Sequence, residues 1–156
     1  TMLRHTGTVN REECREISLN HKPDTIQASM LLVVLRHLED KIERRRKIAR
    51  YYDSEMSRLV ICPGEPQGAR HVYYDYIIQC GRRDDLKCFL ETRGIEVKIH
   101  HETLMPDQPA YESLPPRDLP AARRATGRIL SLPCHEAMKD GEAERVAVAV
   151  RDFFVS

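Results

Sequence analysis

The sequence has almost no excess of charge of either sign. Its 25 Lys and Arg residues are balanced by 24 Asp and Glu residues, which leaves a formal net charge of +1. A balance this even gives no bulk electrostatic support to a nucleic-acid partner. The sequence also lacks an apolar run of the ~18–20 residues needed to span a bilayer, and we see no signal-peptide pattern. We therefore expect no membrane partner.

Cysteine is scarce and scattered. The five cysteines are an odd number and form no CxxC pair: Cys14, Cys62, Cys80, Cys88 and Cys134. This usage argues against a disulfide framework and against a zinc ribbon. We expect free thiols in a reducing compartment, and hence a cytoplasmic protein.

Three common catalytic patterns are missing as well: a glycine loop that cradles phosphate, a GxSxG turn and an HExxH helix. What remains is a chain of 156 residues, 41% hydrophobic and 31% charged. That length and balance suit a single ordinary hydrophobic core. Residue chemistry alone predicts an α/β domain and no particular reaction.

Residues 1–59 are predicted to form an N-terminal arm and a long helical region. Asp24 and Gln27 have the spacing of a capping box, which marks a helix start. Apolar residues at helical spacing follow, with the run Met30–Leu35 as the predicted core of the helix. A helix reaching about Leu59 would be unusually long for a domain of this size. It either breaks near residues 36–40 or extends along a surface supplied by something else.

Residues 60–156 are predicted to form a small α/β domain. β-branched and aromatic residues predict three strands, at residues 72–80, 95–99 and 129–132. Capping and turn residues predict helices at residues 86–93, 120–128 and 142–154. The expected fold is a three-stranded, mainly antiparallel sheet covered by helices.

His100, His101 and Glu102 form one candidate cluster. Imidazole and carboxylate groups are competent metal ligands. However, neighbours on an extended strand point to opposite faces, so both histidines cannot easily reach one ion. Simple loop histidines are the default interpretation, and a metal site is the alternative.

The basic run Arg44–Lys47 is a second candidate. It could contact phosphates. Glu39, Asp40 and Glu43 lie beside it, which favours a solvated helix face with ion pairs four residues apart.

Seven segments together carry a family resemblance: LRHTG (Leu3–Gly7), LNHKPDTIQAS (Leu19–Ser29), LEDKIERRRKIARYY (Leu38–Tyr52), HVYYDYIIQ (His71–Gln79), LKCFLETRGIEVKIHH (Leu86–His101), QPAY (Gln108–Tyr111) and ILSLPCH (Ile129–His135). In order and spacing they resemble the C-terminal part of the sugar aminotransferases of the DegT/DnrJ/StrS type. Those enzymes use pyridoxal phosphate and have the aspartate-aminotransferase fold. In that family a large domain binds the cofactor and carries the lysine that holds it, and that domain would precede Thr1. None of the chain's lysines matches the family's lysine motif.

The resemblance also implies roles for individual residues. Asn20 matches an asparagine that reaches toward the cofactor phosphate of the neighbouring subunit, and Lys22 stands where an arginine is usual. His100 matches the histidine of an H-Y-P loop beside the substrate. There His101 replaces the tyrosine and Glu102 the proline. We thus expect Asn20 and Lys22 near the phosphate, His100 and His101 near the substrate, and no catalytic residue or metal ligand in this chain.

The function implied by the resemblance is transfer of an amino group, usually from glutamate, to a keto-sugar nucleotide in polysaccharide or antibiotic sugar biosynthesis. The protein would act as a dimer, and this chain would be catalytic only when joined to the large domain. The alternative is a non-catalytic interaction and dimerisation module of the same fold. Substitutions at four family positions motivate it: Thr6, Lys22, His101 and Pro106.

Overall fold

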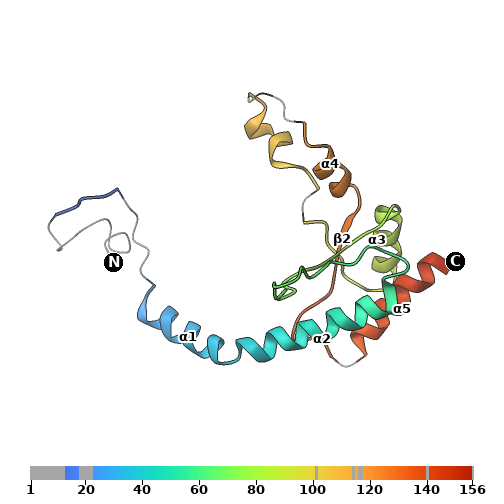
Figure 1. Ribbon diagram of the computed structural model, residues 1–156, viewed down its shortest axis with the longest axis horizontal. Helices are drawn as coiled ribbons and strands as arrows, with labels where there is room; N and C mark the ends of the chain where they lie inside the picture. The colour runs from blue at the N-terminus through green and yellow to red at the C-terminus, as the bar shows by residue number, and fades with distance from the viewer. Residues whose placement is uncertain are drawn as a thin grey trace. The chain divides into compact units, whose positions relative to one another are not determined.

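The computed structural model describes residues 13–17, 23–100, 102–113, 115, 118–139 and 141–155 (Figure 1). By compactness the chain divides into two units, residues 1–39 and residues 40–156.

Helix α1 (Thr25–Arg36) is the main described element of the first unit. The predicted capping box is present, and Gln27 Oε1 accepts the Asp24 N–H at 3.0 Å. The helix ends at His37, whose N–H is donated to the Val34 carbonyl at 3.1 Å. Helix α2 (Leu38–Met56) begins one residue later. The first of the two predicted alternatives, a break near residues 36–40, is therefore confirmed.

The apolar run Met30–Leu35 lies inside α1, as predicted, but its side chains form no buried core within the described residues. The side chains of this run are 46% to 65% exposed, and α1 buries no residue. Apolar residues lie on several sides of α1. A helix of that kind is normally buried among other elements. Among the described helices, none is both long and apolar enough to cross a bilayer.

The second unit is built on two short strands, β1 (Tyr76–Gln79) and β2 (Ile129–Leu132). They pair antiparallel, with Tyr76 opposite Leu132 and Gln79 opposite Ile129. The other elements of this unit are α3 (Arg83–Thr92), the 3₁₀ turns η2 (Met105–Asp107) and η3 (Pro109–Tyr111), α4 (Pro120–Thr126) and α5 (Glu142–Val155). Each predicted helix is thus found, with shifts of a few residues at its ends.

The predicted three-stranded sheet is wrong. Residues 95–99 make an isolated bridge to β2 instead of a strand, through two hydrogen bonds between Lys98 and Ser131 of 2.8 and 3.2 Å. The backbone at the start of this segment bonds to α3 instead of to β2, because the Ile95 N–H is donated to the Leu90 carbonyl at the end of α3. Gly94 makes this turn possible with φ of +69°, a conformation open to glycine.

The first strand is also shorter than the predicted residues 72–80. Tyr73 has φ of +46°, which turns the backbone out of the extended conformation just before β1. Its ring is nevertheless buried in the core beside that of Tyr76, with ring centroids 6.1 Å apart.

The core of the second unit lies between the sheet and its helices. Helix α2 contributes Ile48, Ala49, Tyr52 and Met56, so most of this helix belongs with the second unit. Tyr52 is fully buried and donates its hydroxyl to the Pro133 carbonyl at 2.8 Å. Burial raises the pKa of this hydroxyl, so it serves as a neutral donor at physiological pH.

The core predicts a clear difference between two apolar-to-alanine changes. Leu130 is fully buried in β2, and Leu130→Ala should lower the free energy of unfolding by about 2–5 kcal/mol because it leaves a cavity. Ile61 is 57% exposed and pairs with β1 through its backbone, so Ile61→Ala should change it by no more than about 0.5 kcal/mol. Denaturant unfolding followed by circular dichroism measures both. Equal effects would contradict this core.

Candidate functional site

A hollow of about 470 Å³ opens on the second unit beside the bridge between Lys98 and Ser131. Its walls come from residues 94–100, from β2 and the loop after it, and from the start of α5. Both acidic and basic side chains line it, together with one hydroxyl. The polar side chains that line the hollow include Asp75, Lys98, His100, Ser131, His135 and Arg145.

Three of these side chains meet at one carboxylate oxygen. The Oδ2 atom of Asp75 accepts the Ser131 hydroxyl at 3.0 Å and lies 3.2 Å from His100 Nε2. Ser131 lies on β2 and is buried, Asp75 directly precedes β1, and His100 follows the segment bridged to β2. The pairing of β1, β2 and residues 95–99 therefore brings together groups that are 25 to 56 residues apart in sequence.

The order of bonds in the cluster decides its chemistry. A serine nucleophile needs a base that accepts its proton, as an imidazole does in the Ser-His-Asp arrangement. Here Ser131 donates to the Asp75 carboxylate, and His100 binds the same oxygen from the other side. The hydroxyl is thus not activated by His100. The arrangement is suited to holding a half-exposed imidazole at the edge of the hollow, and so to binding.

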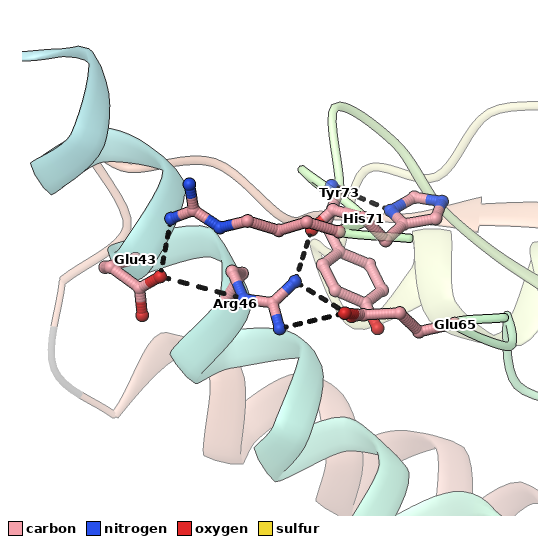
Figure 2. A network of polar contacts seen from close by, with 6 residues as sticks. Glu43, Arg46, Glu65, His71 and Tyr73 are labelled. Carbon is pink, nitrogen blue, oxygen red and sulfur yellow. Dashed lines mark hydrogen bonds and ion pairs between the residues drawn. The ribbon is translucent and has the colours of Figure 1, made fainter. Parts of the chain in front are cut away.

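A second polar network holds the loop that leads to Asp75 (Figure 2). Arg46 of α2 makes a two-pronged ion pair with Glu65, at 2.8 and 3.2 Å, and donates to the His71 carbonyl at 2.7 Å. The His71 ring accepts the Tyr73 N–H at 2.9 Å. The hydrogen bond from Arg46 lowers the pKa of Glu65. The loop is therefore tied to α2 just before the backbone turns at Tyr73 and reaches Asp75.

The basic run of α2 is not the solvated face that the sequence predicted. The Arg45 and Arg46 side chains are largely covered, and both pair with distant residues. Arg46 also lies 3.7 Å from Glu43, the acid three residues before it. Arg45 reaches Glu136 with contacts of 2.7 and 2.9 Å. Arg44 donates to the Met138 carbonyl at 2.8 Å. These bonds fix the loop after β2, which is one wall of the hollow.

Of the four site residues predicted from the resemblance, only His100 is described by the structure. Asn20, Lys22 and His101 lie outside the described residues, and their roles stay predictions. For the metal alternative, no three His, Cys, Asp or Glu side chains gather at one point in the part of the chain that the structure describes. Sequence reasoning missed Asp75 and Ser131. The signal for Asp75 was present, since it is the one acid within the apolar and aromatic run at residues 71–79.

The family model of the DegT/DnrJ/EryC1/StrS aminotransferase family matches residues 1–151. The "Pleiotropic regulatory protein" of Geobacillus stearothermophilus is 31% identical over 88% of this chain and 39% of its own length. A dTDP-3-amino-3,6-dideoxy-alpha-D-galactopyranose transaminase of Aneurinibacillus thermoaerophilus is 28% identical over 97% of this chain and 42% of its own.

The fold has a solved counterpart. A DegT DnrJ EryC1 StrS aminotransferase from Brucella abortus matches with a TM-score of 0.88 and 33% identity, over 97% of this chain and 41% of that one. The chain thus spans about two fifths of the length of the relatives that it matches.

The wall of the hollow gives a prediction about pH. A bond from its own backbone and the Arg45 guanidinium lower the pKa of Glu136 from 4.5 to about 2. A lowered pKa means that the stabilisation is present above pH 4.5 and is lost as the pH falls toward 2. An NMR titration of the Glu136 carboxyl should show a midpoint near 2, and Arg45→Met should raise that midpoint.

Arg124→Met serves as the matched control, because Arg124 is exposed on α4 and should leave the Glu136 midpoint where it is. A midpoint that does not respond to Arg45→Met would show that this ion pair does not hold the wall.

Proposed function

The chain belongs to the DegT/DnrJ/EryC1/StrS aminotransferase family, and we propose that it is the C-terminal part of a sugar aminotransferase that uses pyridoxal phosphate. The proposed reaction moves an amino group from a donor such as glutamate to a keto-sugar nucleotide. The observation that carries the proposal is the position of His100. The residue that matches the family's substrate-side histidine is held at the rim of a hollow by Asp75.

His100 is proposed to contact the substrate directly. Its side chain is 46% exposed while Nε2 is held by Asp75. In the neutral ring with a proton on Nε2, Nδ1 carries the lone pair and can accept a hydrogen bond from a sugar hydroxyl. When protonated, the ring offers a positive charge to a phosphate. His101 is proposed as its companion, and Asn20 and Lys22 as donors to the cofactor phosphate of a neighbouring subunit.

Two described lysines, Lys87 and Lys98, are poor candidates for covalent attachment of the cofactor. A lysine that holds pyridoxal phosphate covalently has to be neutral, which desolvation or a nearby cation favours. Lys98, at the hollow, is 63% exposed and pairs with Glu96 at 3.1 Å, and Lys87 pairs with Glu91 at 2.7 Å. The hydrogen bond with Glu91 raises the pKa of Lys87 and so favours its charged form. We therefore assign to this chain the binding of substrate and not the chemistry of the cofactor, which would supply the amino-group carrier when bound elsewhere in the protein.

The non-catalytic module remains the alternative proposal. Of the four substitutions behind it, only Pro106 lies in the described residues, where it forms part of the turn η2. Proline suits the first turn of such a helix, so its presence there has a structural reason of its own. An activity assay decides between the two proposals.

The first prediction concerns His100 in a chimera in which this chain replaces the matching segment of the Brucella abortus aminotransferase. His100→Ala should raise KM for the keto-sugar nucleotide roughly 10- to 100-fold, because a hydrogen bond to a charged group is worth about 1.5–3 kcal/mol. Gln67→Ala, on an exposed loop, is the control and should leave KM unchanged.

An unchanged KM in His100→Ala would remove His100 from the substrate site. A folded chimera that transfers no amino group from glutamate to any keto-sugar nucleotide tested would favour the non-catalytic module.

The second prediction concerns α1. Its exposed apolar surface is proposed to pack against the remainder of the longer fold and to support the dimer. In this chain by itself that surface should drive self-association, since a contiguous exposed apolar patch of this kind marks an interaction site. Sedimentation velocity should show oligomers, and Leu32→Glu should shift them toward the monomer. Val155→Glu adds the same charge at an exposed residue of α5 and should not. A strictly monomeric profile at high concentration would contradict the proposal.

A further inference from the structure

We propose that Asp75 is a positioning residue for His100, with Ser131 holding the carboxylate in place. The inference rests on the proposed function in one respect, which is that His100 contacts the substrate. Asp75 itself is expected to touch His100 and not the substrate. Its task is to set which edge of the imidazole faces the hollow and which ring nitrogen carries the proton.

The geometry of the shared oxygen supports this assignment. One atom, Asp75 Oδ2, meets a hydroxyl on one side at 3.0 Å and an imidazole nitrogen on the other at 3.2 Å. A carboxylate oxygen has two lone pairs and can accept both bonds at once. The carboxylate is therefore a link between a buried group of the sheet and a half-exposed group at the hollow.

Ser131 is a rigid anchor for that link. Its side chain belongs to a residue that is only 6% exposed. Its backbone is paired on both sides, with Ile77 of β1 and with Lys98. Because the backbone of Ser131 is paired on both sides, its hydroxyl has a fixed origin. The hydrogen bond from this hydroxyl therefore restricts rotation of the Asp75 carboxylate. The carboxylate thereby connects the sheet to the His100 side chain, which is 46% exposed.

Charge also favours the contact. The other charged or titratable groups that line the hollow are Glu96 and Lys98 from the bridged segment, His135 from the loop after β2, and Glu142 and Arg145 from α5. Lys98 is paired with Glu96, and Arg145 donates to the Arg93 and Gly94 carbonyls. Asp75 is the carboxylate that lies within hydrogen-bonding distance of the His100 ring. In this proposal Asp75 orients an Nε2–H donor, as carboxylates commonly do for histidines at functional sites.

A purely structural role for Asp75, as acceptor for the Ser131 hydroxyl, is the rival explanation. The two differ in what happens when both Asp75 and Ser131 lose their polar atoms. The double variant Asp75→Ala/Ser131→Ala leaves no buried hydroxyl without a partner, so its fold is expected to survive. Under the structural explanation it should behave like the wild type at His100. Under the positioning explanation, the double variant lacks the carboxylate that orients the His100 ring, so the orientation of that ring is lost.

The first measurement is made on the 156-residue chain and needs no enzyme activity. NMR of protein with ¹⁵N-labelled histidine should show the His100 Nε2–H proton in slow exchange in the wild type, and a weaker signal in Ser131→Ala, which lacks the hydroxyl that holds the carboxylate. The signal should vanish in the double variant. Asp75→Asn keeps an oxygen acceptor and should retain part of it. A signal that persists in the double variant would overturn the proposal.

The second measurement uses the chimera and a double-mutant cycle. Relative to Ser131→Ala, the double variant should raise KM for the nucleotide sugar roughly tenfold with little change in kcat. In a His100→Ala background, adding Asp75→Ala to Ser131→Ala should change KM less than about twofold. Equal effects in the two backgrounds would overturn the positioning role. If the chimera transfers no amino group at all, the proposed function fails, and the NMR measurement still decides the contact.

Discussion

The arrangement of the second unit depends on the backbone pairing of β2. Along one edge β2 pairs with β1, and at Ser131 it also exchanges two hydrogen bonds with Lys98. Three segments from distant parts of the chain meet there because one short strand offers donors and acceptors on both sides. This pairing of β2 with two other segments forms the hollow and brings Asp75, Ser131 and His100 together. Without the pairing, the three side chains would not lie next to one another.

Helix α2 supports this pairing from outside the sheet. Its apolar face enters the core, and its arginines reach the two loops that flank the strands. Arg46 ties the loop before β1, and Arg45 ties the loop after β2. Partly covered ion pairs of this kind give little stability in general, but they define geometry well when they are two-pronged. In this protein they hold the loops on which the polar groups of the hollow depend.

The two units differ in how much apolar surface they bury within this chain. The second unit buries its own core between the sheet, α2, α3 and α5. Helix α1 has good local signals, with a capping box and a defined end, but it buries nothing. Its apolar surface is of the type that larger folds cover, and the chain spans about two fifths of its relatives. We propose above that the remainder of a longer fold covers this surface.

Local patterns determined the helices and the family. Caps, apolar periodicity and β-branched runs act between residues a few positions apart, so the sequence alone predicted strand β2 and the approximate spans of α3, α4 and α5, and it offered the break near His37 as one of two alternatives. The seven family segments likewise stand in order along the chain, and the sequence was sufficient to identify them. His100 was found in this way, by its match to a family position.

Only the tertiary structure decided which distant groups meet. The third strand became a single bridge because the Ile95 N–H was already bound at the end of α3. Arg45 and Arg46 paired with Glu136 and Glu65, 91 and 19 residues away, where packing left them partly covered. The meeting of Asp75, Ser131 and His100 was decided in the same way. Such pairings depend on the register of strands and the packing of loops, which short-range sequence patterns do not encode.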